Sequence, residues 1–269
     1  MLKINILGTG HGMATKCYNT CFTIEEDNKH FLVDTGGGNG ILKQLELSNI
    51  DIENISDIFI SHSHLDHILG VIWIIRNLSP KYFHNKKIDD IRIYGNQDVI
   101  YVLNELVKLF ISRDFLYLIN NKIKLIKVSN EEEVTILNRK VTFFDLNAIK
   151  KIQYGFNMQI DDKIKFSFIG DECCSTSTEK YIKGAEWLFA DAYMCGKKAE
   201  IYNPVDKHHH SSVKYISEIA EKNMIKNLIL SHTNDDNIKN RRKEFTEDAI
   251  NFFSGKVFIP NDLDVIIIK

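Results

Sequence analysis

Short apolar runs alternate with amphipathic stretches along almost the whole chain. Runs rich in Ile, Leu, Val and Phe are typical of buried strands, whereas apolar residues spaced three and four apart are typical of helices. The pattern predicts strands at 2–7, 21–25, 30–34, 57–61, 91–94, 122–128, 141–144, 155–160, 164–169, 187–190, 227–230, 256–259 and 264–268. It predicts helices at 40–47, 67–78, 97–111, 177–184, 211–222 and 240–253. Strands and helices that alternate in this way favour an α/β fold with two mixed sheets and helices on the outer faces.

The composition favours one globular domain over residues 1–269. The chain is 44% hydrophobic and carries 34 basic and 36 acidic side chains, for a net charge of -2. No repeat, low-complexity block or Pro/Gly/Ser-rich linker divides it, which favours a single domain. The near-neutral charge argues against a uniformly basic surface for holding a polyanion.

The cysteines and the apolar runs indicate a cytoplasmic protein without membrane association. The chain has five cysteines and no CxxC pair, which favours reduced thiols over a disulfide framework. No apolar run reaches the ~18 residues of a membrane span, and the N-terminus lacks the charged and apolar regions of a signal peptide.

The strongest chemical signal is an HxHxDH sequence at residues 62–67. Three imidazoles and one carboxylate follow directly after an apolar predicted strand, where a helix begins. Neutral nitrogen and anionic oxygen donors that converge in this way suit zinc, iron or manganese. An isolated histidine is usually structural, but four ligand-type side chains at this spacing indicate a metal site.

In this HxHxDH sequence the chain resembles the metallo-β-lactamase superfamily. The resemblance implies an αβ/βα sandwich that binds two divalent metals. Asp171 ends a Gly-Asp turn after one predicted strand, and His232 follows another, as in that superfamily. The residues that match its ligands are His62 and His64 for the first metal, Asp66, His67 and His232 for the second, and Asp171 as the bridging carboxylate.

Within the superfamily the chain is most similar to the ribonuclease Z-like branch, over nearly its whole length. The matching stretches are LGTG at 7–10, LVDTG at 32–36, WLFADA at 187–192, HSS at 210–212 and NDL at 261–263. The resemblance implies that Asp191 orients His210, which would protonate the leaving oxygen. A small shift in the alignment would give that role to His208 or His209 instead.

One ligand of this branch has no counterpart in the chain. The branch carries a histidine shortly before a Gly-Tyr strand, but residues 144–156 contain none. Three alternatives remain open: an oxygen from Asp145 or Asn147, a water molecule, or a weak first site with only the second occupied. We expect zinc, and oxygen ligation at the first metal would shift the preference toward manganese or iron.

The arm with which ribonuclease Z binds tRNA is also missing. Bacterial forms insert it between the Gly-Tyr strand and the Gly-Asp turn, where this chain has only residues 157–169. The basic clusters are interpreted as solvated faces rather than binding patches. The missing arm therefore favours a small-molecule or nucleotide substrate over RNA.

Together these features predict a metal-dependent hydrolase, and most specifically a phosphodiesterase that uses metal-activated hydroxide. Asp66 and Asp171 would orient the hydroxide, and His210 would act as general acid with Asp191 behind it. Two alternatives stay open: a ribonuclease Z-like endoribonuclease that processes tRNA 3′ ends, and a metal-binding or degenerate non-catalytic member. The sequence also leaves a homodimer open.

His11 lies in a glycine-flanked turn directly after the first predicted strand. This position could bring it near the mouth of the site. We interpret it as a loop histidine without a metal role.

Overall fold

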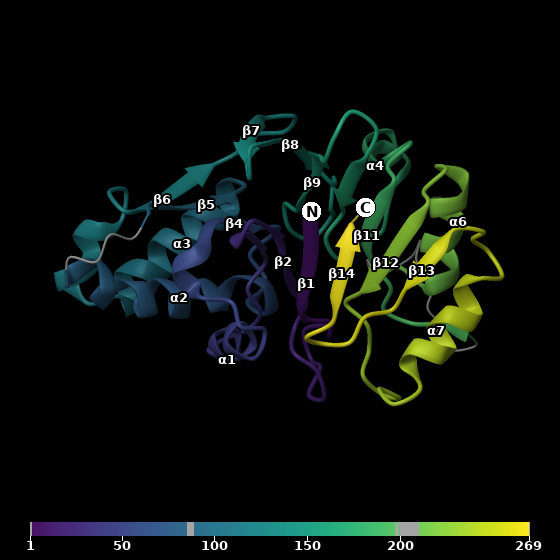
Figure 1. The fold of residues 1–269 in the computed structure, drawn as a ribbon, viewed down its shortest axis with the longest axis horizontal. Coiled ribbons are helices and arrows are strands. Elements are labelled where there is room, and N and C mark those ends of the chain that lie inside the picture. Colours follow the sequence, from purple (N-terminus) through teal and green to yellow (C-terminus); the bar gives the residue numbers. More distant parts are fainter. Residues whose placement is uncertain (1, 85–88, 197–198, 200–209, 269) are drawn as a thin grey trace. The chain divides into compact units, whose positions relative to one another are not determined.

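A computed structural model describes residues 2–84, 89–196, 199 and 210–268 (Figure 1). Contacts between Cα atoms group the chain into two compact units. The first unit comprises residues 1–8, 18–128 and 261–269, and the second comprises residues 9–17 and 129–260. Each unit contains one sheet of seven strands.

The sheet of the first unit combines antiparallel and parallel strands. Its strands are β1 (Leu2–Gly8), β2 (Cys21–Glu26), β3 (Lys29–Val33), β4 (Ile55–Ile60), β5 (Ile91–Gly95), β6 (Ile123–Lys127) and β14 (Val265–Ile268). They lie in the order β14-β1-β2-β3-β4-β5-β6. The strands from β14 to β3 pair antiparallel, and those from β3 to β6 pair parallel.

Helices connect the parallel strands of this unit, as parallel pairing requires. They are α1 (Gly40–Leu47), α2 (Leu65–Phe83) and α3 (Gln97–Phe110), with the short 3-10 helices η1 (Ile52–Asn54) and η2 (Arg113–Leu118). Their apolar faces pack against the sheet in one core that includes Ile41 of α1, Ile74 of α2, Leu103 of α3 and Ile58 of β4.

The second unit repeats this division between parallel and antiparallel pairing. Its strands are β7 (Glu133–Ile136), β8 (Arg139–Asp145), β9 (Tyr154–Gln159), β10 (Lys165–Phe168), β11 (Trp187–Asp191), β12 (Asn227–Ser231) and β13 (Lys256–Phe258). The order is β13-β12-β11-β10-β9-β8-β7. Strands β10 to β13 pair parallel and β7 to β10 antiparallel. The helices α4 (Thr176–Ile182), α6 (Val213–Lys222) and α7 (Arg241–Ala249) pack against it in a second core.

In both units the residues with candidate chemistry follow the carboxyl ends of parallel strands. Asp34 follows β3 and His62 comes after β4 in the first unit. In the second unit Asp171 comes after β10, Asp191 ends β11, and His232 follows β12. Open α/β sheets place their ligand sites beside such strand ends, so the topology itself marks these loops.

The structure confirms the expected α/β fold with two mixed sheets and helices. The short edge strand β7 was not predicted, because it has only four residues and two of them are exposed. The predicted end of the second helix at Leu78 is wrong, since α2 continues to Phe83 with Pro80 inside it. Pro80 cannot donate a backbone hydrogen bond to the carbonyl of Arg76, and α2 ends three residues later.

The last predicted helix is also shorter than expected. Helix α7 ends at Ala249 rather than Phe253, and the side chain of Asn251 donates to the carbonyl of Glu247 at 2.8 Å. A local bond of this kind offers the backbone an alternative to the helix. Throughout the described part of the chain, each helix is too short or too polar to cross a bilayer.

Candidate functional site

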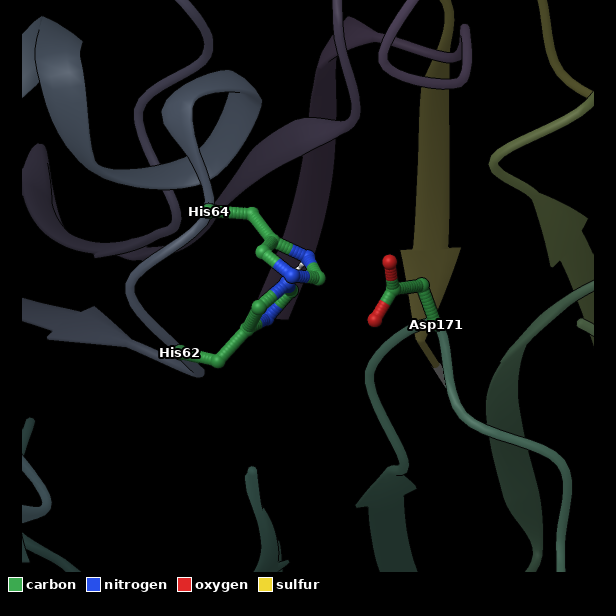
Figure 2. Close-up of side chains that lie close together, drawn as sticks. All are labelled: His62, His64 and Asp171. Atoms are coloured by element: carbon green, nitrogen blue, oxygen red, sulfur yellow. Dashed lines mark hydrogen bonds between the residues drawn. The ribbon is translucent and has the colours of Figure 1, made fainter. Parts of the chain in front are cut away.

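In the first unit, His62 and His64 lie between the end of β4 and the start of α2. Nε2 of His62 lies 2.7 Å from Nδ1 of His64, and the two rings meet edge to face with centroids 4.4 Å apart. Figure 2 shows these two rings turned toward one another; Asp171, drawn with them, belongs to the second unit. His62 is fully buried, so its ring is held in one place by packing.

Asp34 determines which ring nitrogens carry protons. Its Oδ2 accepts hydrogen bonds from Nδ1 of His67 at 2.8 Å and from the hydroxyl of Ser61 at 2.9 Å. Because the Ser61 hydroxyl donates to Asp34, its oxygen accepts from Nδ1 of His62, at 3.0 Å. A neutral imidazole protonated at Nδ1 carries its lone pair on Nε2. Both His62 and His67 can therefore offer the Nε2 lone pair to a metal, as metal-binding histidines typically do.

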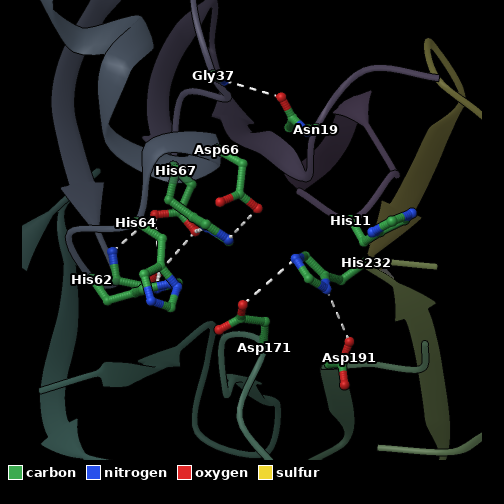
Figure 3. Close-up of polar contacts among 12 residues, drawn as sticks. His11, Asn19, Gly37, His62, His64, Asp66, His67, Asp171, Asp191 and His232 are labelled. Atoms are coloured by element: carbon green, nitrogen blue, oxygen red, sulfur yellow. Dashed lines mark hydrogen bonds and ion pairs between the residues drawn. The ribbon is translucent and has the colours of Figure 1, made fainter. Parts of the chain in front are cut away.

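The carboxylate of Asp66 lies next to the His67 ring, on the side opposite Asp34. Its Oδ2 lies 3.3 Å from Nε2 of His67 (Figure 3). With the proton of His67 held on Nδ1 by Asp34, two electron-pair donors face each other at this distance. A divalent cation, or a second proton on the ring, would relieve their repulsion.

The N-terminus of α3 fixes the backbone of the histidine-rich segment. Asn96 caps α3 by accepting hydrogen bonds from the amides of Asp98 and Val99, and its Nδ2 donates to the carbonyl of Ser61 at 3.4 Å. The hydroxyl of Ser63 donates to Asp98. Asn96 and Asp98 were not predicted to support the site; Asp34 was marked only by its place in the LVDTG stretch at the end of an apolar strand.

His232 in the second unit repeats the arrangement of His67. It follows β12 with a left-handed backbone (φ 55°). Its Nδ1 donates to Oδ1 of the buried Asp191 at 3.1 Å, and its Nε2 lies 3.5 Å from Oδ2 of Asp171 (Figure 3). Again a carboxylate holds the Nδ1 proton, and the Nε2 lone pair faces a second carboxylate oxygen.

His210 lies against the same group of residues. Its Nδ1 is 3.6 Å from Oδ1 of Asp191 and 3.0 Å from the backbone oxygen of Asp171. Burial by itself lowers the pKa of His210, but the carboxylates of Asp191 and Asp171 together raise it above its usual value. Asp171, His210 and His232 each bring one ligand-type atom within 4.8 Å of the others. His208 and His209, the alternatives for His210, lie outside the described residues.

Glu172 adds a carboxyl group that the sequence analysis did not consider. It is 8% exposed, and burial together with the negative charge of Asp171 raises its pKa to about 7. Glu172 directly follows Asp171 in the turn after β10, which places the two carboxyl groups close together. The only sequence signal was its position after the Gly-Asp pair.

The residues suggested in place of the missing histidine take part in a turn. Oδ1 of Asp145 accepts the backbone N–H of Asn147 at 2.8 Å, and Nδ2 of Asn147 donates to Ser177 at 3.1 Å. Among the described residues, Asp145 belongs to no group of three His, Cys, Asp or Glu side chains whose ligand atoms lie within 4.8 Å of one another. Their role as ligands therefore stays a prediction.

Known proteins are similar to this chain in sequence and in fold. Ribonuclease Z of Picrophilus torridus is 27% identical over 280 residues, covering 86% of this chain and 85% of that protein. The metallo-β-lactamase fold protein YhfI of Bacillus subtilis superposes with a TM-score of 0.77 at 18% identity, covering 98% of each chain. A diphosphatase from the PhnP family superposes with a TM-score of 0.75 at 18% identity, covering 100% of this chain and 98% of that one. At these identities the two structures establish the fold alone.

Together, the two mixed sheets and the sequence relatives define a metallo-β-lactamase-fold hydrolase of the ribonuclease Z-like branch. This fold implies that the protein binds divalent metal. Within this class the chain belongs to the Anti-Pycsar protein Apyc1 family, whose model matches residues 2–253.

Proposed function

We propose that the protein is a metal-dependent phosphodiesterase that acts on small or nucleotide-type substrates. One observation carries the proposal: in each unit, a carboxylate holds the Nδ1 proton of a buried histidine whose Nε2 faces a second carboxylate oxygen. The pairs are His67 with Asp34 and Asp66, and His232 with Asp191 and Asp171. Such donor sets fit a divalent metal.

The proposed ligands are those that the resemblance implies, and they would hold two divalent metals. They are His62, His64, Asp66, His67, Asp171 and His232. Zinc is the proposed metal because nitrogen donors are numerous, and manganese or iron would be favoured where oxygen replaces the missing histidine. When bound, such metals act as Lewis acids and lower the pKa of water, which makes a nucleophile available near neutral pH.

The chain's own residues would orient the reacting groups and move the proton. Asp66 and Asp171 would orient the attacking oxygen by accepting its hydrogen bonds. His210, with Nδ1 directed to Asp191 and to the Asp171 carbonyl, would pass a proton from Nε2 to the leaving oxygen. Asp191 would keep the ring in that orientation.

A compact connection between β9 and β10 supports a small substrate. Residues 160–164 alone join the two strands. Asp161 closes this turn by accepting the backbone N–H groups of Lys163 and Ile164. No protruding arm is present at this connection, and the net charge of -2 supplies no general attraction for a polyanion.

A second candidate function is ribonuclease Z-like cleavage of RNA, favoured by the match to Ribonuclease Z over 86% of this chain. The bond would be the same phosphodiester, so the proposed metal chemistry would not change. Only the means of recognition would differ. A cytoplasmic location is also part of the proposal, and the five cysteines form no disulfide in the described residues, as expected in a reducing compartment.

Hydrolysis of bis-p-nitrophenyl phosphate, measured with zinc, manganese or iron added to metal-stripped protein, tests the proposal. We expect turnover that needs metal and that Asp171→Asn abolishes, with the exposed Asp162→Asn as the matched control. A precursor tRNA assayed in parallel at low salt distinguishes the two candidate functions. Failure of every metal to support hydrolysis of any phosphodiester would reject both.

A further inference from the structure

A row of four aromatic rings leads away from Asp171 within the second unit. His210 and His232 stack with centroids 5.0 Å apart. The ring of Tyr193 contacts the ring of His210, with centroids 5.4 Å apart and an interplanar angle of 33°. His11 meets the Tyr193 ring edge-on at 5.0 Å. The proposed reaction uses His210 and His232 and gives no role to Tyr193 and His11.

His11 is held in a defined orientation although it lies in a loop. Its Nδ1 accepts the backbone N–H of Met13 at 3.3 Å, so the neutral ring carries its proton on Nε2. Nε2 lies 4.0 Å from Oδ1 of Asp235. Asp235 is itself fixed, since its Oδ2 accepts the amides of Thr15 and Lys16 at 2.7 and 2.8 Å.

Tyr193 is also fixed by its backbone. Its N–H donates to the carbonyl of Ser211 at 2.9 Å, and its own carbonyl accepts the backbone N–H of Asn234 at 3.0 Å. The side chain is partly exposed and does not belong to the apolar core of the unit. An aromatic ring that contacts two other rings, lies outside the core and is partly exposed is suited to contact a ligand.

The charges around these two rings favour a neutral ligand group. Asp235 lies beside His11, and the carboxylates of Asp236, Asp191 and Asp235 all act on Tyr193. A phosphate would be repelled here. The hydroxyls of a ribose and the N–H groups of a base would instead find hydrogen-bond acceptors.

We propose that Tyr193 and His11 form the surface that contacts the nucleoside part of the substrate. This rests on the proposed phosphodiesterase function, because His210 protonates the leaving oxygen there and Tyr193 packs against the His210 ring. Aromatic side chains contact bases and sugars mainly by stacking, which tolerates different bases. Tyr193 and His11 thus determine specificity for nucleotides over simple phosphate diesters.

The test consists of hydrolysis rates on two substrates and one binding measurement, each made on the wild type and on variants. Values of kcat/KM are determined for a 3′,5′-cyclic nucleotide and for bis-p-nitrophenyl phosphate, which has neither ribose nor base, using the metal-loaded full chain. Binding of a nucleoside 5′-monophosphate is measured by calorimetry. The variants are Tyr193→Leu, Tyr193→Phe and His11→Gln, with Tyr101→Leu, at an exposed tyrosine of α3, as the matched control. Melting temperatures show that each variant is folded.

Tyr193→Leu is expected to lower the ratio of the two kcat/KM values about tenfold or more, mainly through KM, and to weaken monophosphate binding by a similar factor. Tyr193→Phe, which keeps the ring, should retain most of both. His11→Gln keeps an acceptor for Met13 and should show a smaller loss in the same direction. Equal losses on both substrates, or no change in monophosphate binding, would overturn the proposal. If the wild type cleaves no phosphodiester, the proposed function fails, and the binding measurement still decides the role of Tyr193.

Discussion

At the scale of single residues, buried carboxylates prepare the histidines for metal. Asp34 and Asp191 each hold an Nδ1 proton, so the tautomer of His67 and of His232 is set before any ligand arrives. The sequence could identify His67 because its neighbours His62, His64 and Asp66 are adjacent in the chain. It could not assign Asp34 to His67, since the two residues are 33 positions apart and meet only through the pairing of β3 with β4.

Replacing Asp34 with Asn should therefore weaken metal binding without unfolding the chain. An amide oxygen still accepts one hydrogen bond, but it lacks the charge that raises the basicity of the ring. We expect affinity for zinc to fall about 10–100-fold, measured by competition with a chromophoric chelator. Asp27→Asn, at an exposed turn between β2 and β3, is the control and should bind like the wild type. Equal affinity in both variants would contradict the role given to Asp34.

His30 makes stability depend on pH independently of the metal residues. It is buried, its Nδ1 lies 3.1 Å from Oγ1 of Thr23, and burial lowers its pKa in the folded chain. The unfolded chain, with a histidine pKa of about 6.5, then takes up a proton more readily. Stability is fully present above that pH and falls as the pH drops below it.

The measurement for His30 is the free energy of unfolding in urea at pH 7.5 and pH 5.5. His30→Gln should lose less stability between these two values than the wild type does. Identical losses in the two proteins would show that His30 does not contribute to the pH dependence.

At the scale of elements, the approach of α2 to the loop after β3 positions the histidine-rich segment. The amide of Gly70 in α2 donates to the carbonyl of Gly36 at 3.0 Å. A Cβ added at Gly70 would lie 2.1 Å from the carbonyl oxygen of Thr35. The sequence showed a helix here, but not that one of its glycines touches another backbone.

Gly70→Ala is expected to destabilise the protein by about 2–3 kcal/mol, because the helix must move away from Thr35. Ordinarily the same change inside a helix is stabilising. Gly38→Ala is the matched control, since nothing lies within 4 Å of the added carbon, and it should change stability by less than about 0.5 kcal/mol. Thermal and chemical unfolding measure both. A neutral or stabilising Gly70→Ala would contradict the close approach.

Some helices and strands could be predicted from the sequence, and others could not. Buried parallel strands such as β4 and β12 were recognised from continuous apolar runs. The edge strand β7 and the last turn of α2 were not, because pairing of β7 with β8 and packing of α2 override a weak local signal. The contact between the Tyr193 and His210 rings was likewise not predicted, because it depends on the loops after β11 and before α6 coming together.

At the scale of the whole molecule, the balance of charge and the short connection between β9 and β10 support the proposed small substrate. The chain has nearly equal numbers of acidic and basic side chains. Residues 160–164 alone join β9 to β10. These features favour recognition of a small substrate by residues next to the reacting group, such as Tyr193.

Metal should stabilise the folded chain as a whole, because the folded state binds it and the unfolded chain does so weakly. Removing it with a chelator is expected to lower the melting temperature by several degrees, since binding at 100 times Kd contributes about 2.7 kcal/mol. Adding zinc back should restore the original value, as followed by differential scanning calorimetry. An unchanged melting temperature across this cycle would count against a stabilising metal site.

The most direct test of the account is the number of metal ions per chain. Zinc-saturated protein, freed of unbound metal by gel filtration, is analysed by plasma mass spectrometry alongside a variant with both His62 and His232 replaced by Ala. We expect close to two ions per chain in the wild type and a marked loss in the variant. Wild-type protein that retains no metal would contradict it.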